Sequence, residues 1–206
     1  IMGLLVHSKE KIKIVGDKSL SKRDFLRVTE PLKKFGAKFK TNSGRLPITI
    51  EGTDKPSPIR YTENKGSAQC KSAVMLAAIN TKGQTIIKAK KSRDHSEILF
   101  KYLKLPIRVI KNKKYDLIKL RGVKKINLLN YKIPSDISSG AFFIVLTALL
   151  KNSKLKIKNI NINPSRVGII KILKMMNVKI SLKNVKNYKG EKTADITLKV
   201  QILLKL

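Results

Sequence analysis

The chain has 206 residues, of which 46 are Lys or Arg and 13 are Asp or Glu, and its net charge of +33 at pH 7 favours anionic partners over cationic ones. The single cysteine, Cys70, excludes an internal disulfide, and the two histidines, His7 and His95, offer no metal-ligand spacing, so we predict no metal site. The longest apolar run, residues 140–150, is too short to cross a bilayer, and the first residues have neither a charged n-region nor a cleavage site. We therefore expect a cytoplasmic protein of one or two domains with no membrane partner.

The net charge also invites a nucleic-acid-binding interpretation. The excess is spread along the whole chain, however, and lysine occurs together with much isoleucine and asparagine. Aromatic residues make up only 5%, which leaves few platforms on which bases stack. We predict no nucleic-acid partner, with a basic nucleic-acid-binding α/β protein as the alternative. The positive field does attract small anionic substrates.

The spacing of apolar residues predicts alternating strands and helices, and hence an α/β chain. In the first part, we expect strands at 11–15, 47–52, 58–63, 85–89, 107–111, 115–122 and 125–133 and helices at 25–36, 67–80 and 95–105. Pro31 interrupts the first helix and predicts that it is kinked or short. In the second part, we expect helices at 137–150 and 166–176 and strands at 154–160, 178–184 and 194–200.

These elements are predicted to repeat. Residues 58–122 and 125–200 both follow the order strand, helix, strand, helix, strand, strand, and residues 11–52 correspond to the back half of a further copy. In both complete copies the second helix follows a Ser-Arg pair, at positions 92–93 and 165–166. A period of this size predicts stacked α/β units.

The best domain boundary lies at Ile133-Pro134, because proline ends a strand and disfavours a helix before it. We therefore expect residues 1–133 to be part of a first domain, with one partial and one complete repeat unit. Residues 134–206 are expected to start a second domain with one unit.

The helix that begins after Gly66 has an unusual first turn. Ser67, Ala68 and Gln69 are small or polar, and none of them is acidic. A helix N-terminus binds anions through its free N–H groups, and small side chains let a ligand reach the backbone. Capping of the helix by Ser67 is the simpler interpretation of this turn taken alone.

A second segment, residues 90–99, contains an arginine without a local structural task. Asp94 and Glu97 have the spacing of an N-cap and capping-box pair for a helix from His95, so we assign them no catalytic role. Arg93 stands at the strand-to-helix junction, where a guanidinium can clamp a phosphate. Arg23 likewise follows the end of a predicted strand.

Several segments together resemble the EPSP synthase family, the 3-phosphoshikimate 1-carboxyvinyltransferases. They are GDKSLSKR, GRLPITIEG, GSAQCKSAVMLAAIN, SRDHSE, DISSGAFFIVLTALL and NPSRVGIIKIL, in that order. The resemblance covers nearly the whole chain and is closest to the branch with S-A-Q at the helix start. The alternative is the related UDP-N-acetylglucosamine enolpyruvyl transferase family, which shares the fold but would not carry SAQ or SRDHSE.

The resemblance implies a fold of repeated β-α-β-α-β-β units, of class α/β (α+β), with parts of two domains present and an active site between the domains of the full enzyme. It implies transfer of the enolpyruvyl group from phosphoenolpyruvate to the 5-hydroxyl of shikimate 3-phosphate, without a metal or organic cofactor, in a protein expected to be monomeric at full length. By resemblance, shikimate 3-phosphate contacts Ser67, Ala68, Gln69 and Arg93, and phosphoenolpyruvate contacts Arg23 and Gln69.

The chain also departs from the family. The family's N-terminal lysine-serine-arginine cluster, its Gly-Asn-Ala-Gly-Thr-type loop, its catalytic aspartate and its R-x-K-E-S-D-R segment have no counterpart in residues 1–206. We therefore expect a middle fragment that holds part of each substrate site, contains no catalytic residue and is inactive alone. Asp136 is expected to cap a helix and to have no catalytic role.

Overall fold

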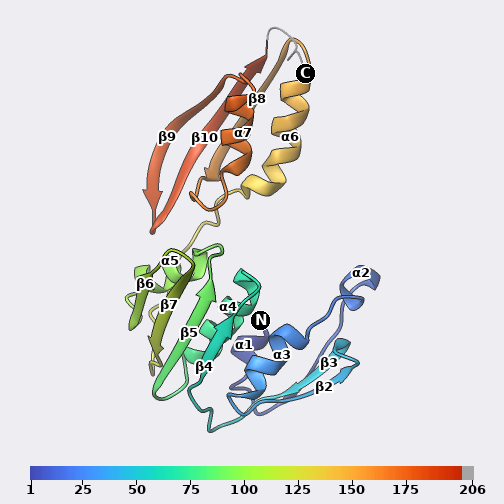
Figure 1. Ribbon diagram of the computed structural model, residues 1–206, viewed down its shortest axis with the longest axis vertical. Coiled ribbons are helices and arrows are strands. Elements are labelled where there is room, and N and C mark those ends of the chain that lie inside the picture. Colours follow the sequence, from blue (N-terminus) through green and yellow to red (C-terminus); the bar gives the residue numbers. More distant parts are fainter. Residues whose placement is uncertain (201–206) are drawn as a thin grey trace. The chain divides into compact units, whose positions relative to one another are not determined.

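Two units make up the chain in the computed structural model, which describes residues 1–200. The first unit runs from Ile1 to Asn127, and the second begins at Leu128 (Figure 1). The boundary predicted from the sequence, between residues 133 and 134, lies a few residues later. That these units belong to two domains of a larger enzyme remains a prediction.

The first unit contains two sheets. Its helices are α1 (Met2–Leu5), α2 (Lys18–Ser21), α3 (Leu26–Lys33), α4 (Ala68–Ala78) and α5 (His95–Tyr102). Its strands are β1 (Lys11–Ile14), β2 (Lys38–Asn42), β3 (Arg45–Glu51), β4 (Arg60–Glu63), β5 (Gln84–Lys90), β6 (Ile107–Lys111) and β7 (Tyr115–Arg121). One sheet has the antiparallel order β1-β3-β2, and the other has the order β4-β5-β7-β6, in which only β4 and β5 pair in parallel.

The central strands of both sheets have the alternation that the sequence predicts. In β3, Leu46, Ile48 and Ile50 are buried while their neighbours face outward. Ile87 of β5 and Ile118 of β7 stand opposite each other and are fully buried. A side-chain period of two places these residues on the core face of each sheet.

Helix α4 lies at the centre of the first unit, between α1 and α3 on one side and the β4-β5-β7-β6 sheet on the other (Figure 1). A helix that is apolar on all sides is stable only when it is covered on all sides, and Val74, Met75 and Ala77 are each fully buried. Gly3 of α1 allows the close approach, because a Cβ at this position would lie 2.1 Å from the carbonyl oxygen of Ala73. Most of α4 is therefore buried, and its accessible side chains are Ala68 and Gln69 at the N-terminal end together with Ser72 and Leu76 on one face.

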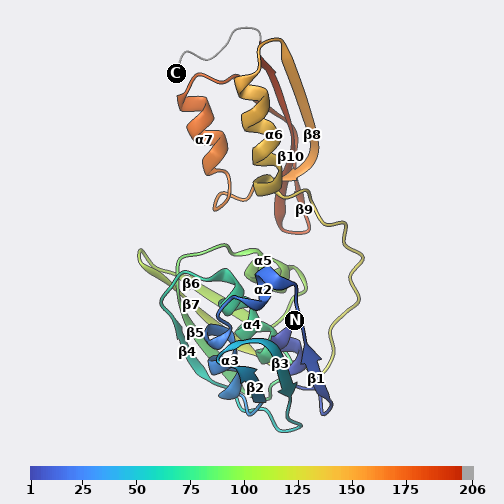
Figure 2. The ribbon, with the colours of Figure 1, turned by 90° about the vertical axis from the view of Figure 1, so that its right-hand side faces the viewer.

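Within residues 128–200, the second unit contains one sheet and two helices. Its elements are α6 (Ile137–Leu149), β8 (Ser153–Asn161), α7 (Gly168–Met175), β9 (Ile180–Tyr188) and β10 (Glu191–Val200). The strands form an antiparallel sheet of order β8-β10-β9, and both helices cover the same face of it (Figure 2). Ile144 of α6, Ile160 of β8 and Ile196 of β10 are fully buried between these layers.

The predicted repeat is present with one correction. The first unit has the expected order β4, α4, β5, α5, β6, β7, and the second unit repeats the order of its last five elements. The strand predicted at 125–133 is wrong, because this segment pairs with no strand within residues 1–200. Only Ser135 makes a parallel bridge, to Ile160 of β8, at the position where β4 pairs with β5 in the first unit. Alternation of apolar residues indicates a strand only where a sheet edge is available to pair with it.

Three further elements were not predicted. Strand β2 (Lys38–Asn42) lies in a lysine-rich segment without buried residues, and α1 and α2 are single turns of four residues. The prediction of a short helix is confirmed, since α3 includes Pro31 and ends at Lys33 rather than at residue 36. Among residues 1–200, no helix is long and apolar enough to span a bilayer.

The helices of the second unit expose many large apolar side chains. Phe142 of α6 and Met175 of α7 are 79% and 83% exposed, and Phe143, Leu146 and Ile172 are more than half exposed. Large exposed apolar areas promote association in water. We name this surface, formed by these five residues, the apolar face.

We predict that the purified 206-residue chain self-associates at micromolar concentration through the apolar face. The double substitution Phe142→Ser with Met175→Lys is expected to raise the monomer fraction in analytical ultracentrifugation. Val15→Ser is the control, because Val15 is also exposed but lies in the first unit. Association that persists unchanged in the double variant would contradict the prediction.

Candidate functional site

The first turn of α4 has the geometry of a capped but open helix N-terminus. Gly66 adopts φ of +70°, a conformation that favours glycine, and turns the chain into the helix. Ser67 is the N-cap, and its Oγ accepts a hydrogen bond from the backbone N–H of Cys70 at 3.3 Å. The predicted cap is thus confirmed. Since a hydroxyl both donates and accepts, the Ser67 O–H still has a proton to donate.

Polar side chains of β4 stabilise the chain just before this turn. In β4, Glu63 is buried, and its Oε1 accepts a hydrogen bond from the backbone N–H of Lys65 at 2.9 Å. Burial, together with the nearby Cys70 and Glu63, raises the pKa of Tyr61 to about 12. Tyr61 is therefore a neutral packing residue beneath the start of α4 at physiological pH.

A first cavity opens beside the first turn of α4 and has a volume of about 360 Å³. Ala68, Gln69 and Ser72 of α4 line one side, and Arg93 with His95 lines the other. Ala68 offers only a methyl group, so the backbone of the turn is accessible from this cavity. The structure therefore brings together the predicted residues Ala68, Gln69 and Arg93.

A second cavity, of about 270 Å³, lies next to the first. Arg23, Asp24 and Arg27 line it together with Gln69 of α4. The Asp24 carboxylate has a local hydrogen-bond partner, because its Oδ1 accepts a hydrogen bond from the backbone N–H of Leu26 at 2.8 Å. Gln69 lines both cavities, whereas Arg23 lines only the second and Arg93 only the first.

Arg27 is a site residue that the sequence reasoning missed. It lies in the first turn of α3 and lines the same cavity as Arg23. The spacing of four residues between the two arginines was the available signal, but the predicted helix from residue 25 did not indicate which face of it was buried. The second cavity therefore has two guanidinium groups where one was predicted.

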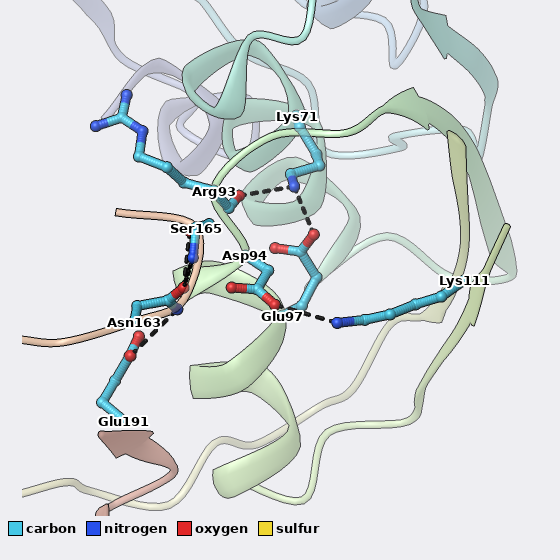
Figure 3. Close-up of polar contacts among 8 residues, drawn as sticks. All are labelled: Lys71, Arg93, Asp94, Glu97, Lys111, Asn163, Ser165 and Glu191. Carbon is cyan, nitrogen blue, oxygen red and sulfur yellow. Dashed lines mark hydrogen bonds and ion pairs between the residues drawn. The ribbon is translucent and has the colours of Figure 1, made fainter. Parts of the chain in front are cut away.

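The guanidinium groups of the cavity arginines have no internal partners in the described part of the chain. Among residues 1–200, the guanidinium groups of Arg23, Arg27 and Arg93 make no hydrogen bond or ion pair. In Figure 3 the Arg93 guanidinium points away from the polar contacts made around its own backbone. Guanidinium groups without internal partners bind phosphate and carboxylate in bidentate geometry.

The predicted capping box at Asp94 and Glu97 is wrong. Asp94 is the N-cap of α5, but its side chain makes no capping hydrogen bond, and its Oδ2 lies 3.4 Å from Lys111 Nζ. Glu97 is buried and forms an ion pair with Lys71 of α4, with Oε1 and Nζ 2.6 Å apart (Figure 3). Sequence spacing could not reveal this partner, because Lys71 is 26 positions away and lies on a different helix.

The second unit has a corresponding helix N-terminus with a different cap. Asp136 caps α6 by accepting a hydrogen bond from the backbone N–H of Ser138 at 3.0 Å, which confirms the predicted role. Arg166, the counterpart of Arg93 in the repeat, is 3.3 Å from Asp136 Oδ1 and also bonds to the Ser138 hydroxyl. The N-terminus in the second unit is thus neutralised internally, whereas Ser67 leaves Arg93 without a carboxylate partner.

The loop that presents Arg166 is fixed by a polar cluster (Figure 3). Asn163 Oδ1 accepts hydrogen bonds from the backbone N–H and the hydroxyl of Ser165, at 2.9 and 2.7 Å. Glu191 Oε2 accepts hydrogen bonds from the side-chain amides of Asn161 and Asn163, at 3.1 and 3.5 Å. Within the described part of the chain, no group of three His, Cys, Asp or Glu side chains has a metal-binding arrangement.

Comparison with known proteins identifies the family. The sequence model of EPSP synthase (3-phosphoshikimate 1-carboxyvinyltransferase) matches residues 1–203. The chain belongs to the EPSP synthase family. The resemblance inferred from the sequence motifs is therefore confirmed.

Individual relatives agree with this assignment. The chain is 41% identical over 204 residues to the 3-phosphoshikimate 1-carboxyvinyltransferase of Ruthia magnifica subsp. Calyptogena magnifica and 41% identical over 203 residues to that of Petrotoga mobilis. It also superimposes on a solved structure of EPSP synthase from Acinetobacter baumannii with a TM-score of 0.79 at 34% identity. These alignments cover 97–98% of the chain but only 45–46% of the relatives, so the chain spans about half their length.

The Asp136 cap generates a prediction about pH. The Ser138 N–H bond, followed by the Arg166 contact, holds the pKa of Asp136 below its usual value of 3.8. A depressed pKa means that the carboxylate stabilises the folded state above pH 4 and that this contribution is lost as pH falls. We expect Asp136→Ala to destabilise the second unit by about 1 kcal/mol at pH 7 and by progressively less below pH 4.

The measurement is urea unfolding at pH 7, 5 and 3, followed by the NMR methyl signals of Ile144 and Ile196 in the core of the second unit. Asp54→Ala is the control, because Asp54 is exposed and caps no helix. A loss of stability that stays constant from pH 7 to pH 3 would contradict the prediction.

Proposed function

We propose that the protein to which this chain belongs transfers the enolpyruvyl group of phosphoenolpyruvate to the 5-hydroxyl of shikimate 3-phosphate and releases phosphate. The observation that carries the proposal is the pair of adjacent cavities, each with its own unpaired arginine and both lined by Gln69. Two anionic substrates that react with each other need two neighbouring anion sites. The names of the relatives support the same reaction.

The first cavity is assigned to shikimate 3-phosphate in this proposal. Its ligands are the backbone at Ala68, the Gln69 amide and the Arg93 guanidinium, from residues that line the cavity, and the hydroxyl of Ser67, which precedes them but does not line the cavity. The free N–H groups at the start of α4 and the guanidinium favour a phosphate dianion from two sides. Ser67 caps the helix, and in this proposal its hydroxyl also donates a hydrogen bond to the phosphate.

The second cavity is assigned to phosphoenolpyruvate. Arg23, with Arg27 beside it, faces the carboxylate and phosphate of this substrate, and Gln69 links it to the neighbouring cavity. This placement brings the acceptor hydroxyl and the enol carbon together, which lowers the entropic part of the barrier.

In this proposal, the chemical step is an addition followed by an elimination. The 5-hydroxyl oxygen bonds to C2 of phosphoenolpyruvate while the methylene carbon gains a proton. Loss of phosphate and of a methyl proton then restores the double bond. The residues of this chain bind, orient and balance charge, while proton transfer is assigned to residues outside positions 1–206. Arginine is a poor proton shuttle at neutral pH.

We place the reaction in the cytoplasm, which agrees with the single buried thiol of Cys70. The full-length protein is proposed to be a monomer with small-molecule anionic substrates, no cofactor and no nucleic-acid partner.

The function is tested with a chimera in which residues 1–200 replace the matching segment of the Acinetobacter baumannii EPSP synthase. We expect phosphate release that requires both phosphoenolpyruvate and shikimate 3-phosphate, and none with UDP-N-acetylglucosamine as acceptor. The 206-residue chain alone is expected to bind shikimate 3-phosphate weakly and to show no turnover. A folded chimera that binds neither substrate would disprove the proposal.

Substitution of the two predicted arginines separates the cavities. In the chimera, Arg93→Ala is expected to weaken shikimate 3-phosphate roughly 30-fold and phosphoenolpyruvate much less, and Arg23→Ala is expected to do the reverse. Each substitution removes a charged hydrogen-bond partner, which contributes about 2 kcal/mol.

Isothermal titration calorimetry with each ligand measures both effects. Arg108→Ala is the matched control, because Arg108 is an exposed arginine of β6 that lines neither cavity. Equal losses for both ligands in both variants would argue against the separate assignments.

A further inference from the structure

The only ion pair with both side chains almost fully buried, within residues 1–200, joins Lys71 and Glu97 beside the first cavity. Their side chains are 1% and 4% exposed, and Lys71 Nζ lies 2.6 Å from Glu97 Oε1. Lys71 Nζ also donates a hydrogen bond of 2.8 Å to the backbone carbonyl oxygen of Arg93 (Figure 3). The ammonium group therefore connects α4, α5 and the turn between β5 and α5.

Stability alone does not explain this pair. The cost of removing two charges from water is large, and an apolar pair of similar volume often gives an equal or more stable protein. Glu97 Oε2 is buried and has no hydrogen-bond partner among the described residues, so the carboxylate depends on Lys71 for its compensation. The arrangement therefore has a structural consequence that an apolar pair cannot reproduce, namely the bond to the Arg93 carbonyl.

That bond acts on the residue whose guanidinium lines the first cavity. It fixes the Arg93 backbone against the helix turn that carries Ala68 and Gln69. A second link lies beside it, because the hydroxyls of Ser72 on α4 and Ser96 on α5 are 2.6 Å apart and both residues line the cavity. The two walls of the cavity are thus joined by polar contacts at its base.

We propose that Lys71 and Glu97 are positioning residues for the anion in the first cavity, and that they act through Arg93. They do not line the cavity themselves. The inference rests on the proposed function for the identity of the ligand, shikimate 3-phosphate, but not for the existence of an anion site at Arg93.

The test is an NMR titration with shikimate 3-phosphate, phosphoenolpyruvate and inorganic phosphate, performed on the 206-residue chain with Phe142→Ser and Met175→Lys, the substitutions expected to keep it monomeric. The double variant Lys71→Met with Glu97→Met removes both charges and the bond to the Arg93 carbonyl while keeping an apolar core. We expect its shikimate 3-phosphate dissociation constant to rise roughly tenfold. Phosphoenolpyruvate binding in the second cavity and the urea unfolding midpoint are expected to stay nearly unchanged.

Dependence on Arg93 distinguishes positioning from a general structural effect. In an Arg93→Ala background, the Lys71 and Glu97 substitutions are expected to cause no further loss of affinity, because the residue through which they act is already absent. An additional tenfold loss in this background, or unchanged affinity in the double variant, would overturn the inference. Should the double variant fail to fold, Glu97→Gln is expected to cause a smaller loss with the same dependence on Arg93.

A matched control removes an exposed ion pair. Lys33 and Glu30 of α3 are 2.8 Å apart and about half exposed, so Lys33→Met with Glu30→Gln is expected to leave all three titrations unchanged. If the parent chain binds inorganic phosphate at Arg93 but not shikimate 3-phosphate, the proposed function fails and the same comparison is made with phosphate. If the parent chain binds no anion at Arg93, the positioning inference is overturned as well.

Discussion

The burial of most of α4 is the constraint on which the rest of the first unit depends. Its apolar residues are covered by α1 and α3 on one side and by a sheet on the other, and this leaves the N-terminal turn and the face with Ser72 and Leu76 accessible. The N-terminal end then becomes the place where a chain with a large positive charge has both free backbone N–H groups and nearby arginines. The loops that carry Arg23 and Arg93 reach this end from different elements, and Gln69 stands between them.

The two copies of the repeat differ at the N-terminus of their first helix, α4 or α6: a carboxylate caps this end in the second copy but not in the first. In each unit an arginine just before the second helix of the repeat, Arg93 or Arg166, lies near the start of the first helix. In the first unit the cap is Ser67, a neutral hydroxyl, and the Arg93 guanidinium has no carboxylate partner among residues 1–200. In the second unit the cap is Asp136, which pairs with Arg166. The carboxylate at the cap position of the second unit thus supplies the anionic partner that the Ser67 hydroxyl does not supply to Arg93.

The sequence predicted the features that depend on local spacing and on motif resemblance. These include α4 with its Ser67 cap, the order of elements from residue 58 to 121, and the grouping of Arg23, Gln69 and Arg93 around one helix end. It did not predict β2 or the absence of pairing at 125–133, because strand formation depends on a partner edge that only the tertiary structure supplies. It also gave Glu97 the wrong role. Capping-box spacing was present, but burial of Lys71 created a stronger partner for the carboxylate than the helix backbone.

Net charge contributes less to the site than its size suggests. At physiological ionic strength the screening length is about 8 Å, so most of the 46 basic residues do not act on a ligand in either cavity. Lys71 is close enough, but Glu97 neutralises it. The site therefore depends mainly on the fixed positions of a few groups near the start of α4, and not on the total charge of the chain. Because Lys71 holds Arg93 by its carbonyl and not by its guanidinium, the backbone is ordered in advance while the charged group remains available. A ligand then orders only the side chain, whose rotamer entropy is about 2 kcal/mol, and this limits the cost of binding.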